Sequence, residues 1–166
     1  MSLLIRPGVS ADVPLILQFI RELAEYEREA NAVVATEARL QRDGFGAAPL
    51  FFVRIAEWDG EAAGFALYFL NYSTWRGAPT LYVEDLFVRP VHRGKKIGGA
   101  LMRDLAREAV RRGCERFAWQ VLDWNHPAID FYESLGAKVL REWLAVRIDG
   151  DALSALAARP AMAGSE

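Results

Sequence analysis

The sequence predicts a mixed α/β domain, in which one central sheet carries helices on both faces. Strand-like and helix-like segments alternate along the chain in the order β-α-α-β-β-β-α-β-α-β. Three strand-like segments follow one another in the middle, which is typical of an antiparallel meander. The 166 residues suit one domain and leave little room for a second. We therefore expect a single domain over residues 1–158 and a flexible C-terminal tail over residues 159–166.

The first part of the chain predicts one strand and two helices. Residues 3–6 form a short strand candidate that a Pro-Gly pair stops. A helix follows, because apolar residues recur at the spacing of one buried helix face, at Leu15, Ile16, Phe19, Ile20 and Leu23. A second, short helix is expected over residues 36–43, with Gly44 just beyond its end.

The middle of the chain predicts three consecutive strands. Residues 50–58 are rich in aromatic and branched side chains, and Asp59-Gly60 is a hairpin-turn signal. Residues 62–70 are the return strand. Residues 71–79 contain a glycine and a proline and are expected to form a loop before a third strand over residues 80–88.

The last part of the chain predicts alternating helices and strands. A long amphipathic helix follows a glycine-rich turn and ends at Gly113. Beyond it we expect a strand over 116–122, a short helix over 127–135, a last strand over 138–148 and a small helix over 152–158.

Composition and charge narrow the classes of function. The chain has 20 Lys and Arg against 22 Asp and Glu, whereas sequence-independent nucleic-acid binders carry a basic excess, so no nucleic-acid partner is expected. No apolar run approaches the ~20 residues that cross a bilayer, and no signal peptide is apparent. We therefore expect a cytoplasmic protein without a membrane partner. One cysteine and two histidines argue against a zinc site, so no metal is expected.

A glycine-rich basic turn, Arg93-Gly94-Lys95-Lys96-Ile97-Gly98-Gly99, leads into the long helix. The first N–H groups of a helix have no internal partner, and the helix dipole adds positive charge there. Glycines let the backbone approach an anion closely, so the turn indicates a phosphate site. The alternative is a solvated basic turn that merely begins a helix. The turn matches neither a Walker loop nor a dinucleotide fingerprint.

Two adjacent carboxylates, Glu84 and Asp85, interrupt an otherwise apolar strand. Because side chains alternate across a strand, we expect the two to point to opposite faces, so that at least one meets a buried surface or a cleft. A buried carboxylate must pair, take up a proton or serve a site. Glu84 is therefore a candidate for a catalytic base, and the alternative is a structural ion pair with an arginine.

Several segments together resemble the GNAT superfamily of N-acetyltransferases. The resemblance rests on Glu84–Val88, Arg93–Gly99, Asn125 and Phe131–Ala137, and it covers nearly the whole chain in the expected order. It implies the GNAT fold, whose mostly antiparallel mixed sheet splays open at the cofactor site, and acetyl-CoA as co-substrate. A closer resemblance, to the spermidine/spermine (diamine) acetyltransferases and above all their thialysine-acetylating branch, rests on Glu22–Glu27, Asp43–Gly46, Tyr72–Gly77 and Val121–Asn125.

The resemblance implies roles for individual residues. Tyr132 would protonate the departing CoA thiolate, and Glu84 would accept the proton of the amine through water. The alternative for Tyr132 is a core tyrosine on a short amphipathic helix. Acetyl-CoA would be held by Leu86, Phe87, Val88, Arg93, Gly94, Lys95, Lys96, Ile97, Gly98, Gly99, Asn125 and Tyr132. The acceptor amine would be bound by Tyr26, Glu27, Trp75, Glu84 and Asp85.

The expected enzyme transfers an acetyl group from acetyl-CoA to the primary amine of a small cationic molecule, by direct attack in a ternary complex. Ser73 stands where the diamine acetylases carry an aspartate that holds the polyamine, which favours a lysine-like amino acid such as thialysine.

The alternatives are a spermidine/spermine acetyltransferase, or an enzyme of the same superfamily acting on protein N-termini, lysines or an antibiotic. A non-catalytic acetyl-CoA-binding regulatory module and a plain anion-binding interaction domain are further alternatives. The resemblance also implies a homodimer. Lys96 stands where the superfamily usually has glycine, and the sequence leaves open whether it aids or weakens CoA binding.

Overall fold

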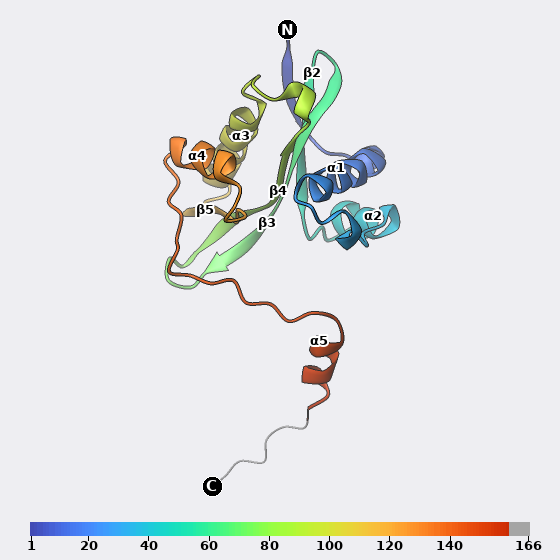
Figure 1. Ribbon diagram of the computed structural model, residues 1–166, viewed down its shortest axis with the longest axis vertical. Helices are drawn as coiled ribbons and strands as arrows, with labels where there is room; N and C mark the ends of the chain where they lie inside the picture. Colours follow the sequence, from blue (N-terminus) through green and yellow to red (C-terminus); the bar gives the residue numbers. More distant parts are fainter. Residues whose placement is uncertain (160–166) are drawn as a thin grey trace. The chain divides into compact units, whose positions relative to one another are not determined.

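The computed structural model describes residues 1–159, and its five-stranded mixed sheet carries helices on both faces (Figure 1). The chain divides into two compact units, one over residues 1–124 and one that begins at Asn125. The sheet belongs to the first unit, and the mixed α/β fold that the sequence predicts is confirmed. Residues 160–166 of the expected tail lie outside the described residues.

The strands lie in the sheet in chain order. They are β1 (Leu3–Pro7), β2 (Phe52–Trp58), β3 (Glu61–Ser73), β4 (Ala78–Val88) and β5 (Arg116–Trp119). The first four are antiparallel to their neighbours, whereas β5 pairs parallel with β4. This arrangement follows from the connections, because short turns join the meander and the long helix provides the crossover to β5.

The helices are distributed between the two units. The first unit holds α1 (Val13–Tyr26), α2 (Glu37–Phe45), α3 (Ile97–Arg111) and the short 3-10 helices η1 (Ser10–Asp12), η2 (Ala30–Ala32) and η3 (Pro90–His92). The second unit holds α4 (His126–Ser134) and α5 (Gly150–Ala157). Gly44 lies inside α2 rather than beyond its end, and Thr36 caps this helix by accepting from the Arg39 N–H.

Two hydrophobic cores flank the sheet, one on each face. On one face α1 and α2 cover a core that includes Ile16, Phe19, Ile55, Phe65 and Phe87. On the other face α3 covers a core that includes Tyr68, Leu81, Val83, Ile97, Leu101 and Leu105. Figure 1 shows α1 and α2 on the opposite side of the strands from α3. Burial of these apolar faces fixes the helices that carry the candidate site.

A buried carboxylate, Glu108, ties α3 to the sheet. It accepts hydrogen bonds from Arg111 of its own helix and from Arg112 just after it, and it lies 3.5 Å from Arg54 of β2. Hydrogen bonds from Arg111, and then from Arg112, outweigh burial and lower the pKa of Glu108 to about 2. Arg54 also donates to Asp104 at 2.9 Å. The middle and the C-terminal part of α3 are thereby tied to β2.

The expected loop over residues 71–79 is wrong in its length. Antiparallel pairing continues through Asn71↔Thr80, Tyr72↔Pro79 and Ser73↔Ala78, so that only residues 74–77 turn. The proline does not break the strand, because it stands one residue after the start of β4, where a missing N–H is tolerated.

The expected last strand over residues 138–148 is also wrong. The described residues after β5 contain helices and irregular backbone without a strand. The segment has apolar side chains in a strand-like pattern, but a strand forms only where a neighbour pairs with it. Its large apolar side chains are exposed, among them Leu140, Trp143, Leu144, Val146 and Ile148. The strand expected over 116–122 likewise stops at Trp119.

Candidate active site

A β-bulge in β4 decides where the two predicted carboxylates point. Val83 pairs with Tyr68 and Asp85 pairs with Leu67, so that Glu84 is an extra residue in the strand. Val83 before the bulge and Leu86 after it both pack on the α3 side. In a regular strand, two residues on the same face are separated by one residue that points to the other face. Here two residues, Glu84 and Asp85, separate Val83 from Leu86, so both of them lie on the α1 side. The expectation that they point to opposite faces is therefore wrong.

The same bulge marks the place where the sheet opens. β5 pairs with β4 only from Thr80 to Val83. Within residues 1–159, the part of β4 from Glu84 to Val88 has no strand on its β5 side. Its backbone groups along that edge lack a strand partner, which an extended ligand could supply, although the Val88 carbonyl already accepts from Arg93 Nε. Leu86, Phe87 and Val88, which the sequence analysis assigns to the cofactor, lie along this open edge.

The glycine-rich turn presents backbone N–H groups at the start of α3. The first intrahelical bond runs from the Ala100 N–H to the Lys96 carbonyl at 3.1 Å, so the N–H groups of Ile97, Gly98 and Gly99 have no acceptor inside the helix. Lys96, the residue before the helix, adopts a left-handed conformation with φ 61° and ψ 17°. Gly94 also has a positive φ, of 78°. The turn therefore has the geometry of an anion site.

The basic side chains of the turn differ in how they are held. Arg93 stacks its guanidinium over Tyr26, 4.6 Å from the ring centroid, and its Nε donates to the Val88 carbonyl at 3.3 Å. Lys95 Nζ lies 3.1 Å from Nδ1 of the buried His92 and over the Trp58 ring. Lys96 is exposed, and its side chain makes no hydrogen bond or ion pair within the described part of the chain, residues 1–159.

Three carboxylates interact on the α1 side of the bulge, and we call Glu27, Glu84 and Asp85 the acidic cluster. Burial, followed by the charges of Glu84 and Glu27, raises the pKa of Asp85 to about 7. Burial also raises the pKa of Glu27. Neither Glu84 nor Asp85 forms a salt bridge within residues 1–159, which argues against a structural ion pair with an arginine. A carboxyl group that titrates near neutrality can accept a proton at physiological pH.

The end of α1 forms a corner beside the acidic cluster. Tyr26 is the last residue of the helix, and Glu27 and Arg28 follow it. Arg28 has a positive φ of 65°, and its guanidinium lies over the Trp124 ring, 4.5 Å from the centroid. Arg28 does not stand out in the sequence, because no glycine marks the left-handed position. Trp124 belongs to one of the motifs of the resemblance but carries no expected role.

The structure separates one predicted substrate residue from the others. Trp75 is 80% exposed in the turn between β3 and β4. This turn lies at the opposite end of β4 from the bulge, about 20 Å along the strand at 3.3 Å per residue. Tyr26, by contrast, contacts Arg93, so it links the end of α1 to the glycine-rich turn.

The remaining predicted residues belong to the second unit. Asn125 is buried and caps α4, where its side chain accepts from the Ala128 N–H. Asparagine is among the residues that favour this N-cap position. Tyr132 lies in α4 with its ring 5.2 Å from the ring of Phe131.

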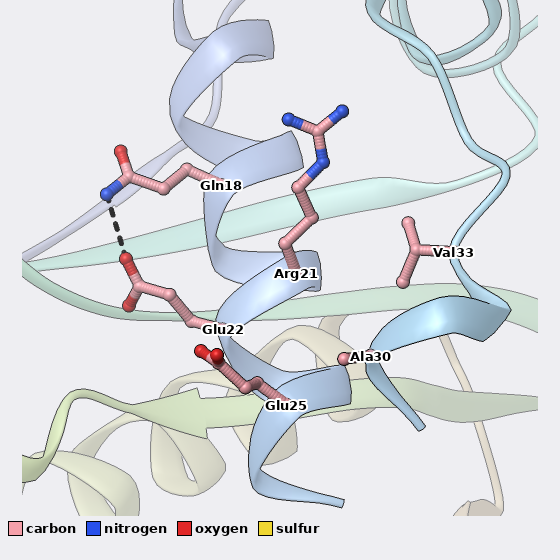
Figure 2. A pocket seen from close by; sticks show the side chains of 6 residues that line it. All are labelled: Gln18, Arg21, Glu22, Glu25, Ala30 and Val33. Atoms are coloured by element: carbon pink, nitrogen blue, oxygen red, sulfur yellow. Dashed lines mark hydrogen bonds between the residues drawn. The ribbon is translucent and has the colours of Figure 1, made fainter. Parts of the chain in front are cut away.

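A separate open pocket lies on the outer surface between α1 and η2. It is lined by Gln18, Arg21, Glu22, Glu25, Ala30 and Val33 (Figure 2). Gln18 donates to Glu22, which also pairs with Arg89. None of the predicted site residues lines this pocket, so the bulge and the turn remain the candidate site. Within residues 1–159 no helix is long and apolar enough to cross a membrane. In the same residues no three His, Cys, Asp or Glu side chains are arranged so that they could hold a metal ion.

Comparisons with known proteins agree with this geometry. The model of the acetyltransferase (GNAT) family matches residues 17–137. The thialysine N-epsilon-acetyltransferase of Sus scrofa is 41% identical over 95% of this chain and 99% of its own. The L-ornithine N5-acetyltransferase of Arabidopsis thaliana is 32% identical over 92% of this chain and 86% of its own. An integron cassette protein from the mobile metagenome of V. cholerae superimposes with a TM-score of 0.80 at 29% identity, over 96% of this chain and 99% of its own.

Proposed function

Since the chain belongs to the acetyltransferase (GNAT) family, we propose that it acetylates the terminal amine of a lysine-like amino acid with acetyl-CoA as the donor. It is an N-acetyltransferase that acts on an amine of a small cationic substrate. The observation that carries the proposal is the acidic cluster, which stands where the sheet opens between β4 and β5. Relatives named for thialysine and ornithine, both amino acids with a terminal amine, support this acceptor class.

Acetyl-CoA fits the residues of the glycine-rich turn. The N–H groups of Ile97, Gly98 and Gly99 would hold the pyrophosphate, and the exposed Lys96 would add a positive charge. Arg93, Gly94 and Lys95 would shape the turn around it. The open edge of β4, from Leu86 to Val88, would receive the pantetheine arm together with Asn125. The bound molecule supplies an acetyl group activated as a thioester.

The acidic cluster would bind and deprotonate the acceptor. An ammonium has no lone pair, so it must lose a proton before it attacks a carbonyl. Glu27, Glu84 and Asp85 would attract the cation, with Tyr26 beside them. We assign proton acceptance to Glu84 through water, with Asp85 beside it in the acidic cluster. Tyr132 would donate its hydroxyl proton to the departing thiolate. Trp75 lies in the turn at the far end of β4, so we do not assign it to this acceptor site.

The assembly and location of the enzyme belong to the same proposal. Residues 1–158 would act as one acetyltransferase domain, since the family match runs across the boundary between the two units. The exposed apolar side chains between Leu140 and Ile148 would be buried in a homodimer, which sedimentation would detect. The free thiol of Cys114 suits a reducing compartment, so we place the protein in the cytoplasm, without nucleic-acid or membrane partners.

An acceptor panel tests the proposal. The purified protein is mixed with acetyl-CoA and thialysine, lysine, ornithine, spermidine or an aminoglycoside, and the release of free CoA is measured. We expect the highest kcat/KM for a lysine-like amino acid. A preference for spermidine would make the protein a polyamine acetyltransferase. Tight binding of acetyl-CoA without turnover of any amine would leave a non-catalytic binding module.

A further inference from the structure

The corner after α1 places an arginine in an unusual conformation beside the acidic cluster. Arg28 has φ 65°, a region that residues with a Cβ seldom occupy. Such a conformation persists where the surroundings hold it, and it is often found at functional sites. Here its side chain contributes, because the guanidinium stacks on Trp124 at 4.5 Å. The stack fixes the direction of the cation.

Stacking leaves the hydrogen-bond donors of Arg28 unused. A guanidinium presents its N–H groups in its plane, so an aromatic ring against one face does not satisfy them. Across residues 1–159 the Arg28 side chain forms no ion pair and no hydrogen bond. Arg28 is exposed and Trp124 is 37% exposed, so a solute can reach the N–H groups of the guanidinium. A fixed guanidinium of this kind is suited to a carboxylate, which it can bind through two parallel hydrogen bonds.

The Arg28 guanidinium lies next to the acidic cluster in the chain. Glu27, its neighbour in the chain, is close enough to Asp85 to raise the pKa of that group. The acidic cluster, which attracts a cation, therefore lies next to the Arg28 guanidinium, which attracts a carboxylate. A lysine-like amino acid has the same order of charges, with an ammonium at the end of its side chain and a carboxylate at its α-carbon.

We propose that Arg28, held by Trp124, binds the α-carboxylate of an amino-acid acceptor whose terminal amine lies at the acidic cluster. This inference rests on the proposed function and adds to it a residue that determines specificity. The decarboxylated diamine keeps both ammonium groups and has a hydrogen in place of the carboxylate, so Arg28 loses its partner and repels the ammonium that remains nearby. Arg28 therefore selects amino acids against their decarboxylated counterparts.

The test compares acceptors that differ only in the carboxylate. Lysine is paired with cadaverine, and thialysine with the diamine sulfide that lacks its carboxyl group. Values of kcat/KM are measured for the wild type and for Arg28→Gln, Arg28→Lys and Arg21→Gln. Arg21 is the matched control, because it is an exposed arginine on α1 that lines the separate pocket of Figure 2. The Arg28 variants keep a Cβ at the left-handed position, so backbone strain is the same in all of them.

The expected result is a selective loss. Removal of a charge-assisted hydrogen bond lowers kcat/KM of Arg28→Gln for the two amino acids about tenfold to a hundredfold, through KM. Its kcat/KM for the two diamines stays the same or rises. Arg28→Lys recovers part of the loss because it restores the charge, and Arg21→Gln behaves like the wild type.

Two outcomes overturn the inference in different ways. If Arg28→Gln loses activity equally toward amino acids and diamines, or if the wild type does not distinguish them, Arg28 has no role in recognising a carboxylate. If the wild type acetylates none of the four compounds, the proposed function itself fails and the role of Arg28 with it.

Discussion

Replacement of Lys96 by glycine should stabilise the protein, because Lys96 holds a left-handed backbone at the start of α3. An L-residue in this conformation costs ~1–2 kcal/mol relative to glycine, for which the region is open. The added freedom of glycine in the unfolded chain takes back ~0.5–1 kcal/mol. Lys96 is exposed and its side chain makes no hydrogen bond or ion pair among residues 1–159, so little else is lost. The net gain is ~0.5–1 kcal/mol, which raises Tm by roughly 1–4 °C in a chain of this size.

A second variant separates the backbone from the charge. Lys96→Ala removes the ammonium but keeps a Cβ at φ 61°, so it should not share the gain in Tm. If Lys96 contacts the pyrophosphate, both variants should bind acetyl-CoA more weakly by a similar factor. Tm is measured by circular dichroism, and the dissociation constant of acetyl-CoA by isothermal titration calorimetry.

The comparison of the two variants can refute the reasoning. An equal rise in Tm for Lys96→Ala and Lys96→Gly would show that the left-handed backbone is not the cause. Unchanged affinity for acetyl-CoA in both would show that the ammonium takes no part in binding. Tighter binding by Lys96→Gly alone would mean that the Cβ, rather than the charge, affects the approach of the phosphates.

Three further substitutions test the candidate site. The pKa of Asp85 is raised from 3.8 to about 7, so the folded state binds its proton more tightly and loses stability as pH rises through this window. A shift of this size corresponds to a free energy of at most ~4 kcal/mol. Because the folded protein relaxes around the charge, we expect Asp85→Asn to raise the free energy of unfolding by ~1–2 kcal/mol at pH about 8 and to leave it almost unchanged at pH about 4. We also expect this variant to have a lower kcat. Urea unfolding at both pH values checks this, and a gain that does not depend on pH would contradict it. Gly98→Asp places a negative charge and a side chain at the first turn of α3, so calorimetry should show at least about tenfold weaker acetyl-CoA binding with little change in Tm. Tyr132→Phe should lower kcat by about a hundredfold or more while acetyl-CoA binding stays close to wild type, and full activity in this variant would remove the proposed acid.

The sequence predicts the elements whose pattern is local. The apolar period of α1 and the Asp59-Gly60 turn define a helix and a hairpin without help from distant residues. The strand expected over 138–148 has the right side chains, but pairing depends on a neighbour that local sequence does not specify. Pro79 was a misleading signal, because its position within the strand decides whether it breaks pairing.

The sequence identifies the residues of the candidate site better than it predicts the directions of their side chains. The glycine-rich turn and the Glu84-Asp85 pair are visible in the chain, since both violate the pattern around them. Strict alternation gave the wrong direction for one carboxylate, because a bulge is set by the cross-strand register. The left-handed Arg28 could not be anticipated, because the sequence has a long charged residue where glycine would be the usual signal.

The bulge at Glu84 sets the charge of one face of β4. The surplus residue turns both carboxylates toward α1, directly after the point where the pairing of β4 with β5 ends. Deletion of that residue would restore regular pairing between β3 and β4 and leave one carboxylate on this face instead of two. The local negative charge therefore depends on the register of two strands and not only on which residues the chain carries.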